Sequence, residues 1–422
     1  MKIAKINVRN FKSFHNQEIS FHHFSILVGG NASGKSNIIS LFKFISNLIK
    51  YGLDEALSRL GGIDSLVNMA IGSKETTLLR YEIDFHDNEI ITKKTEDSIT
   101  YLQVEQVIFE IEIKSNDNHL DYEVLKDELT IKYSCYDGPA KQYGNFILTT
   151  SKGVDIVSQV TYHPFSNPIN ETIARSIQED EVFLNDFLIY FLRILKSSND
   201  VSIKSLQFII PEFVDCNNFV KIYDFNPKDL KKPSSLTSFK SLDERGLNLA
   251  SILYSIVKRP KEEEKLLDIL ADCLPFIEKI YLENGNDQSV SYVVQETYSN
   301  RRLQASNLSD GTVVMLTMII ALYFDEPTGV IALEEPERSL HPKLLKKLLA
   351  MVREVSKERQ VIITTHNPEL LKHSPLEAII FAKRQKDGFT TVLYPKNSES
   401  VRTFLDHELG IDDLFIQDLL GD

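Results

Sequence analysis

The sequence predicts an α/β protein with a mixed, largely parallel core sheet, an antiparallel β-lobe and a helical insertion. Near the N-terminus a glycine-rich turn separates an apolar run from a helical pattern. Farther along, the apolar runs 330–333 and 361–365 flank an amphipathic helix, as expected of parallel strands that are buried on both faces. Segments between 78 and 150 instead alternate apolar with polar residues, which favours a half-exposed antiparallel sheet.

The glycine-rich turn at 29–36 reads GGNASGKS and fits the phosphate-binding P-loop pattern G-x-x-x-x-G-K-[ST]. A strand is expected before it at 24–28, and a helix after it to about Lys50. Glycines let backbone N–H groups approach phosphate oxygens, and the helix N-terminus points its dipole at the same anion. We expect Lys35 to reach the β- and γ-phosphates and Ser36 to contact Mg²⁺. The nucleotide-binding candidates are Gly29, Gly30, Asn31, Ala32, Ser33, Gly34, Lys35, Ser36 and Asn37.

Residues 1–166 are expected to form the N-terminal part of a nucleotide-binding head. Strand patterns at 2–8 and 17–28 flank a turn, and the β-lobe follows a second turn at 61–64. The proline-containing segment 163–168 marks the end of the lobe. Within the lobe the strand-like runs are 78–85, 102–113, 129–136 and 146–150.

Residues 167–240 are expected to be a mainly helical insertion, and residues 241–422 to be the C-terminal part of the head. Helices are predicted at 247–257 and 262–280, with a break at Arg259-Pro260 because proline cannot continue a helix. The pattern then predicts a strand at 289–295, a helix at 313–323, a strand at 330–333, a helix at 343–359, a strand at 361–365, a hairpin from 378–383 and 390–394, and a short helical tail.

Composition narrows the class of protein. The 422 residues are 42% hydrophobic and 25% charged, as in an ordinary globular protein, and no apolar run reaches the length of a membrane span. The N-terminus shows no signal-peptide pattern, so a cytoplasmic protein without a membrane partner is expected. The three cysteines are far apart, which argues against a zinc site or a disulfide framework. The net charge of −13 argues against a nucleic-acid-coating protein, although basic pairs such as Lys93-Lys94 leave DNA binding open.

Polar side chains follow the two buried C-terminal strands. Glu334 and Glu335 end the first of them, and His366 ends the second. Because two strands joined by one helix are parallel when they share a sheet, these residues should meet the P-loop at the carboxyl edge. With a nucleotide there, Glu334 would face Mg²⁺ and Glu335 would act as general base on the attacking water. His366 would contact that water or the γ-phosphate; taken singly, each of the three also fits an ordinary polar turn.

The segment 308–312, Leu-Ser-Asp-Gly-Thr, precedes a strongly apolar helix. Ser309 and Gly311 at a helix N-terminus could form a second anion site. Taken alone, the segment favours the ordinary N-cap of a buried helix, where Ser and Asp are common.

Together the motifs GGNASGKSN, LSDGT, IALEEPERSLHP and TTHNPELL resemble those of the ABC-type ATPase heads of the SMC and RecF group. The nearest likeness is to OLD-like AAA family ATPases, in which EEPE followed by LHP is typical. The resemblance covers about 1–50 and 240–422, and it implies ATP hydrolysis with Mg²⁺ by a homodimer or a higher even-numbered assembly. In that family Ser309, Asp310 and Gly311 would form a signature that acts in trans, with Ser309 and Gly311 on the γ-phosphate held by the partner's Lys35. The loop Ser339–His341 would cross the dimer interface.

Some features depart from those relatives. Asp310 stands where transporter ATPases usually carry glycine, and the sequence contains neither a C-x-x-C hook nor a long coiled coil. Too few residues follow His366 for the TOPRIM nuclease domain of OLD nucleases, so the resemblance implies a separate effector protein, of nuclease type or another. It further implies a switch, sensor or scaffold in bacterial genome maintenance or anti-phage defence. The Mg²⁺-contacting glutamine of such heads has two candidates here, Gln103 and Gln106.

Two other functions remain open from the sequence. One is an endonuclease with its own metal site in the β-lobe or the insertion, for which Asp84, Asp121 and Glu123 are acidic candidates. The other is an assembly module that binds nucleotide without hydrolysing it.

Overall fold

The computed structural model describes residues 1–85, 89–94, 99–116, 121–137, 140–151, 155–161, 219–236, 241–285, 288–326, 328–407, 410–417 and 419–421. These residues form two compact units, each assembled from separate stretches of the chain. Unit 1 comprises Met1–His22, Ser36–Phe219 and Arg384–Val392; unit 2 comprises His23–Lys35, Val220–Lys383 and Leu393–Asp422. Within the described ranges, none of the helices has the length and apolar character that crossing a membrane requires.

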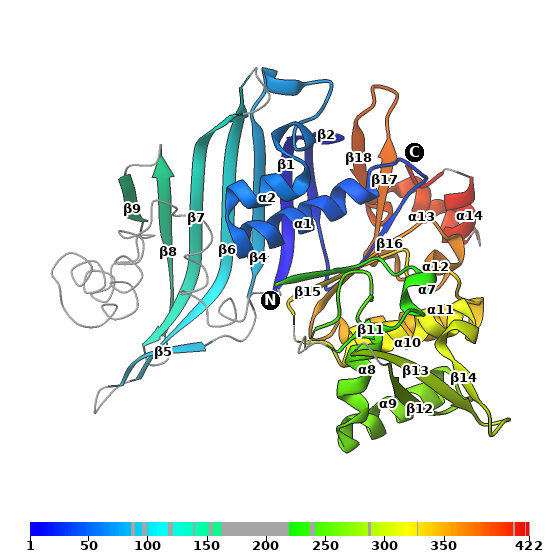
Figure 1. The fold of residues 1–422 in the computed structure, drawn as a ribbon. Coiled ribbons are helices and arrows are strands. Elements are labelled where there is room, and N and C mark those ends of the chain that lie inside the picture. The colour runs from blue at the N-terminus through cyan, green and yellow to red at the C-terminus, as the bar shows by residue number, and fades with distance from the viewer. Residues whose placement is uncertain are drawn as a thin grey trace. The chain divides into compact units, whose positions relative to one another are not determined.

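Unit 1 is built on one antiparallel sheet, drawn in blue to teal in Figure 1. The strand order is β2-β1-β4-β6-β7-β8-β9, and β5 pairs with β6. Alternation along β4 places Leu79, Tyr81 and Ile83 in the core while the intervening side chains are half-buried, as the sequence pattern predicts. The strands are β1 (Lys2–Phe11), β2 (Phe14–Ser20), β4 (Thr77–Asp84), β5 (Glu89–Lys94), β6 (Ile99–Ser115), β7 (Tyr122–Asp137), β8 (Ala140–Ser151) and β9 (Asp155–Thr161).

Two helices cover one face of this sheet (Figure 1). Helix α1 (Lys35–Tyr51) turns an apolar face inward, and the Tyr81 hydroxyl donates a hydrogen bond at 3.0 Å to its Leu41 carbonyl. Helix α2 (Leu53–Leu60) begins after Gly52 and ends at Gly61, which has a left-handed φ of 103°. The helix predicted after the P-loop is therefore present and reaches Tyr51.

Unit 2 contains a parallel sheet with the order β10-β15-β16-β3-β17. Its strands are β10 (Val220–Tyr223), β15 (Val330–Glu334), β16 (Gln360–Thr365), β3 (Phe24–Val28) and β17 (Ile379–Arg384), and β18 (Thr390–Leu393) follows β17 in the chain. All residues of β16 and of β3 are buried, which explains why both strands are rich in Val, Ile and Leu. The predicted α/β class with a parallel core sheet and an antiparallel lobe is confirmed.

A smaller antiparallel sheet and eight described helices complete unit 2. The sheet has the order β11-β13-β12, with β14 paired to β13. Its strands are β11 (Ser234–Ser235), β12 (Ile277–Asn284), β13 (Ser289–Glu296) and β14 (Arg302–Gln304). The helices are α7 (Pro227–Leu230), α8 (Leu249–Val257), α9 (Pro260–Cys273), α10 (Asp310–Tyr323), α11 (Pro342–Val355), α12 (Pro368–Lys372), α13 (Glu399–Asp406) and α14 (Ile411–Ile416).

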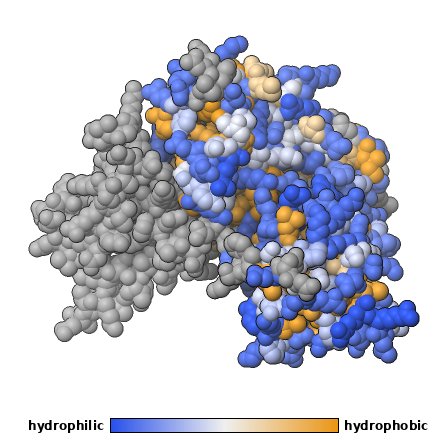
Figure 2. Space-filling model, in the orientation of Figure 1, coloured by the Kyte–Doolittle hydropathy of each residue, from blue (hydrophilic) through white to orange (hydrophobic). Residues whose placement is uncertain are grey.

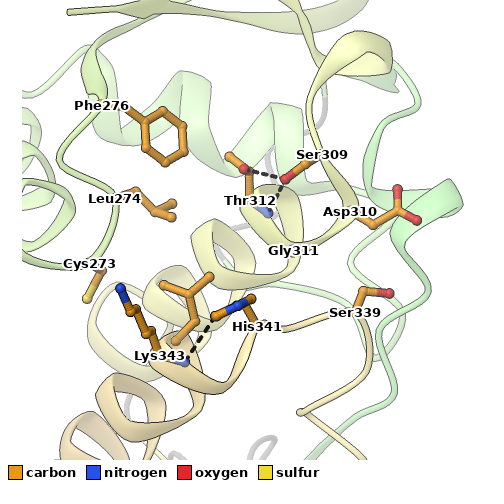
Figure 3. Close-up of a pocket in the computed structure, with 11 residues that line it drawn as sticks. Cys273, Leu274, Phe276, Ser309, Asp310, Gly311, Thr312, Ser339, His341 and Lys343 are labelled. Atoms are coloured by element: carbon orange, nitrogen blue, oxygen red, sulfur yellow. Dashed lines mark hydrogen bonds between the residues drawn. The ribbon is translucent and has the colours of Figure 1, made fainter.

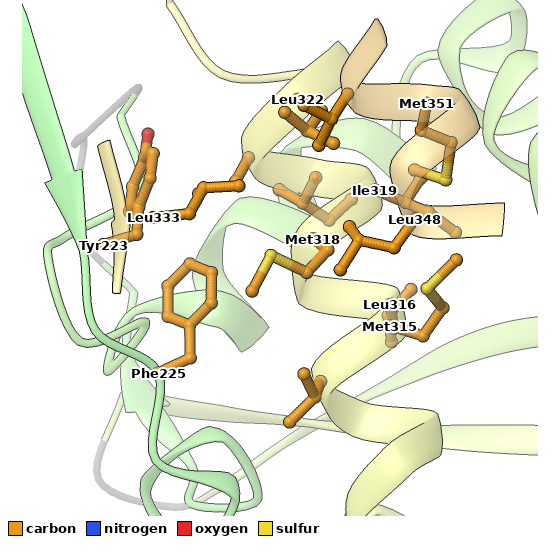
Figure 4. Close-up of a cluster of buried hydrophobic side chains, with 14 of the residues drawn as sticks. Tyr223, Phe225, Met315, Leu316, Met318, Ile319, Leu322, Leu333, Leu348 and Met351 are labelled. Atoms are coloured by element: carbon orange, nitrogen blue, oxygen red, sulfur yellow. The ribbon is translucent and has the colours of Figure 1, made fainter. Parts of the chain in front are cut away.

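Helix α10 is the centre of the unit 2 core. Every residue from Thr312 to Leu322 is buried, so this helix is apolar on all sides rather than on one stripe. Figure 4 shows Met318 and Ile319 of α10 beside Leu348 of α11, with Tyr223 and Phe225 on the other side. The described surface in the view of Figure 2 is mostly hydrophilic, with scattered apolar residues.

Two sequence expectations need adjustment. The helix expected at 262–280 ends at Cys273, and Ile277 already begins β12, which pairs with β13. Pro275 accounts for the break, because it disfavours helical geometry at the residue before it. The strand expected at 17–28 is two strands, β2 and β3. Residues 167–218 of the expected helical insertion lie outside the described residues.

Strand β10 is absent from the sequence expectations. It lies in the range assigned to a helical insertion, yet it pairs with β15 in the parallel sheet of unit 2. In the structure, unit 2 resumes at Val220. The three-part domain division otherwise stays a prediction.

Candidate nucleotide site and signature loop

The carboxyl edge of the parallel sheet gathers the P-loop and the acidic motif. Glu334 is paired with Thr364, and Thr365 is paired with Val28, the last residue before the P-loop. Because β15, β16 and β3 are adjacent and parallel, the segments that follow them leave the sheet at one edge. In the structure, the P-loop and the segments that follow β15 and β16 therefore lie at the carboxyl edge of the sheet, as expected from the topology.

The side chain of Lys35 folds back onto the backbone of the P-loop. Lys35 Nζ donates hydrogen bonds to the carbonyl oxygens of Gly29 at 2.7 Å and Gly30 at 2.8 Å. Gly34 has a φ of 107° and Ala32 a φ of 60°, so the loop passes twice through the left-handed region. Lys35 is 7% exposed. Burial lowers the pKa of Lys35, and the charges of nearby acidic residues oppose this shift.

The other P-loop candidates divide between the two units. Asn31 and Ala32 are exposed at the tip of the loop, and Ser33 is buried. Ser36 and Asn37 lie in the first turn of α1 and count with unit 1. There Asn37 Nδ2 donates to Ser13 Oγ at 2.6 Å, so in this structure the Asn37 amide serves unit 1.

Glu335 is held by its backbone and by both carboxylate oxygens. Its φ of 45° is left-handed, and its N–H donates to the Thr364 carbonyl at 3.0 Å. Oε1 lies 3.1 Å from His366 Nδ1, and Oε2 accepts from Arg338 Nε at 2.9 Å. Burial acts to raise the pKa of Glu335, but the hydrogen bonds and charges of Arg338 and His366 outweigh burial, so the pKa is lowered. The structure thus brings together Glu335 and His366, which the sequence paired.

A buried acid, Glu337, lies in the same segment. It is 6% exposed, and Thr365 Oγ1 donates to its Oε1. Its Oε2 is buried and has no hydrogen-bond partner among the described residues. Burial raises the pKa of Glu337, and the bond from Thr365 offsets this only in part.

The signature-like loop caps helix α10. Ser309 Oγ accepts from the Thr312 N–H at 3.1 Å, so Ser309 is an N-cap. A Cβ on Gly311 would lie 2.7 Å from the Ser339 carbonyl oxygen, so only glycine lets the segment after β15 pass this closely. Lys231 Nζ pairs with Asp310 Oδ1 at 2.5 Å.

A cavity of about 610 Å³ opens beside this loop. In Figure 3 the 309–312 turn and Ser339 and His341 line one side of it, and Cys273, Leu274 and Phe276 line another. The His341 ring caps α11 by accepting from the Lys343 N–H at 3.3 Å. The signature candidates and the loop Ser339–His341 therefore share one surface of unit 2.

The chain is similar to several known proteins. Residues 215–372 match the family described as AAA domain, putative AbiEii toxin, Type IV TA system. The chain is 21% identical over 384 residues to Endonuclease GajA of Bacillus cereus (strain VD045), covering 88% of this chain and 56% of that protein. A crystal structure of an SMC head bound to the C-winged helix domain of ScpA superposes with a TM-score of 0.50 at 15% identity, covering 93% of this chain and 98% of that one. The SMC head domain from Thermotoga maritima gives 0.44 at 13% identity, covering 93% and 99%.

This chain has the fold of an SMC head domain. It spans just over half the length of GajA.

The metal candidates expected from the sequence, Glu334 and Ser36, are oxygen donors. The Glu334 carboxylate ends β15, and the Ser36 hydroxyl follows Lys35 in the chain. Within the described residues no group of three or more His, Cys, Asp and Glu side chains is placed to hold a metal ion. Mg²⁺ at nucleotide sites takes one or two protein oxygens and completes its shell with phosphates and water, so this donor set fits it.

The two candidates for a Mg²⁺-contacting glutamine are Gln103 and Gln106. The Gln106 amide donates to Asp84 Oδ1 at 2.8 Å and accepts from Lys132 Nζ at 2.8 Å. It therefore belongs to a polar row on the sheet of unit 1. The side chain of Gln103 lies outside the described residues.

Sequence reasoning missed three polar residues of this edge. Glu337 is part of the EEPE motif, and its position two residues after Glu335 was the available signal. Arg338 stands three residues after Glu335, a spacing that allows contact within a turn. Asp224, which accepts from Arg338 Nη1 at 2.8 Å, is 114 residues away from it and had no local signal.

Proposed function

We propose that the chain binds ATP with Mg²⁺, closes on a second copy around two nucleotides, and hydrolyses them slowly as a conformational switch. The observation that carries this proposal is the meeting of the P-loop, Glu335 and His366 at one edge of one parallel sheet. Open α/β sheets bind their ligands at this edge.

The chain's own residues divide the work in this proposal. The backbone N–H groups of the P-loop and the N-terminus of α1 hold the phosphates, and Lys35 leaves the Gly29 and Gly30 carbonyls to pair with them. Glu334 and Ser36 would hold Mg²⁺, whose charge would stabilise the phosphoryl oxygens. Glu335 accepts a proton from the attacking water, and His366 orients the Glu335 carboxylate through Oε1.

The second copy supplies the signature. Ser309 and Gly311 lie at the start of α10, where free N–H groups favour an anion. In the proposed closed form they contact the γ-phosphate on the partner head, and Ser339–His341 lies at the interface. We place this switch in the cytoplasm, in anti-phage defence or genome maintenance, acting through a separate effector protein, and in a dimer or higher even-numbered assembly. DNA binding stays open and is decided by a salt-dependent binding isotherm.

Glu335→Gln tests this proposal. The amide keeps the shape of the side chain but cannot take a proton, so we expect phosphate release to fall by about 10²–10⁴-fold. ATP binding should persist, and an ATP-bound dimer should accumulate on size-exclusion chromatography. Unchanged phosphate release in this variant would show that Glu335 is not the general base. A wild-type protein that dimerises with ATP and releases no phosphate would support the assembly module.

The similarity to an endonuclease favours one second candidate, a nuclease activity in this chain. Plasmid DNA with Mg²⁺ or Mn²⁺ is the substrate to test. Cleavage that persists in Lys35→Ala but is lost when Asp84, Asp121 and Glu123 are changed to Ala would support it. Intact plasmid under conditions in which ATP is hydrolysed would exclude it.

A further inference from the structure

Arg338 connects the ends of two neighbouring strands of the parallel sheet. Its Nε donates to Glu335 Oε2 at 2.9 Å, and its Nη1 donates to Asp224 Oδ1 at 2.8 Å. Asp224 follows β10 and Glu335 follows β15, and these strands pair in parallel with Tyr223 opposite Leu333. The planar guanidinium carries donors in a rigid fork, so it can hold two carboxylates in a fixed geometry.

The Glu335 side chain is partly exposed to solvent, so packing alone does not fix the orientation of its carboxylate. Its side chain is 21% exposed, and those of Arg338 and His366 are 46% and 51% exposed. His366 holds Oε1 and Arg338 holds Oε2, so the plane of the carboxylate is set from two sides. Rates of positioned groups are sensitive to about 1 Å of misplacement.

We propose that Arg338 is a positioning residue for Glu335 and that Asp224 in turn fixes Arg338. Arg338 exchanges no proton and touches no substrate in this role. The inference rests on the proposed function, because it assigns Arg338 to the same hydrolysis.

The role of Arg338 differs from that of a surface ion pair that contributes to folding. Ion pairs between exposed groups contribute little to stability. The loss of Arg338 should therefore leave the melting temperature nearly unchanged while it affects turnover. Arg245, which pairs with Asp229 at 2.6 Å and is 60% exposed, is a matched control in the same unit.

The first experiment compares Arg338→Met with Arg245→Met in steady-state ATP hydrolysis. We expect kcat to fall about 10- to 100-fold in Arg338→Met with an unchanged KM, and wild-type values in Arg245→Met. Arg338→Lys should recover only part of the rate, since lysine keeps the charge and loses the fork. Asp224→Asn should also lower kcat, by a smaller factor than Arg338→Met does. Equal kcat in wild type and Arg338→Met would overturn the proposal.

A double-mutant cycle separates positioning from a general structural effect. Residual hydrolysis is followed over hours in Glu335→Gln and in Glu335→Gln combined with Arg338→Met. If Arg338 acts through Glu335, adding Arg338→Met to Glu335→Gln should not lower the residual rate of hydrolysis further. If both rates fall below detection, the kcat values of Arg338→Met and Arg338→Lys with Glu335 present decide the question. The same fold loss in both backgrounds contradicts the positioning role. A wild-type protein that hydrolyses no ATP contradicts the proposed function itself, which is a different outcome.

Discussion

The two glycines that open the P-loop have different surroundings. A Cβ at Gly29 would lie 2.4 Å from the Ala382 carbonyl oxygen and 2.5 Å from Ser33 Oγ, whereas a Cβ at Gly30 would meet nothing within 4 Å. Gly29 is therefore required by the close approach of β17, a strand that follows more than three hundred residues later. The sequence motif explains both glycines by phosphate contact, and only packing distinguishes them.

This difference predicts opposite outcomes for Gly29→Ala and Gly30→Ala. The first forces a backbone oxygen or the loop to move, and we expect it to lower the free energy of unfolding by about 1–3 kcal/mol and to weaken ATP binding. The second should unfold like the wild type. Chemical denaturation of the nucleotide-free proteins measures both, and indistinguishable curves for the two variants would show that β17 does not constrain Gly29.

Among the elements, β10 is anchored by buried charge. Lys221 Nζ pairs with Asp325 Oδ2 at 2.9 Å, and the two side chains are 7% and 1% exposed. The Tyr223 hydroxyl also donates to Asp325, and the Leu242 N–H donates to its other oxygen at 3.1 Å. Asp325 follows α10, so this cluster attaches the outermost described strand of the parallel sheet to the central helix. Burial lowers the pKa of Lys221, and Asp325 opposes that shift.

Removal of Asp325 should therefore be costly. Asp325→Ala leaves the Lys221 ammonium buried without its carboxylate, which costs about 3–5 kcal/mol. Lys372→Ala, which removes a 3.9 Å pair with Asp412 on a side chain that is 55% exposed, should cost at most about 1 kcal/mol. Urea unfolding of the two variants gives the comparison. If Asp325→Ala is no less stable than Lys372→Ala, the cluster does not anchor β10.

For the whole molecule, the parts of the proposed site come from the two ends of the chain and, in the closed form, from two copies. P-loop residues 29–35 lie near the start of the sequence, and Glu335 and His366 come three hundred residues later, yet all of them lie in unit 2. Ser309 lies in that unit too, beside Ser339 and His341. A head-to-head dimer with twofold symmetry would form two equivalent sites, each with a P-loop from one copy and a signature from the other.

Mixing two inactive variants tests this arrangement. Lys35→Ala removes the phosphate contact, and Ser309→Arg blocks the signature while leaving monomeric ATP binding intact. In a mixed dimer one site carries both defects and the other carries none. With random pairing, half of the dimers have one working site of two, so an equimolar mixture should recover about a quarter of the wild-type rate. Hydrolysis by Ser309→Arg alone at the wild-type rate, or no recovery on mixing, would contradict the shared site.

The sequence alone determined the P-loop, the parallel strands after which Glu335 and His366 stand, and the antiparallel lobe. It could do so because each depends on short-range pattern: a fixed loop motif, buried runs, and alternation with a period of two. Tertiary structure alone decided that Val220–Tyr223 is a strand of the parallel sheet, that Arg338 joins Asp224 to Glu335, and that Thr365 contacts Glu337. These contacts join residues that are far apart in the chain, and no periodicity records which strand neighbours which. The side-chain supports of the proposed base therefore appear only when the strands are assembled.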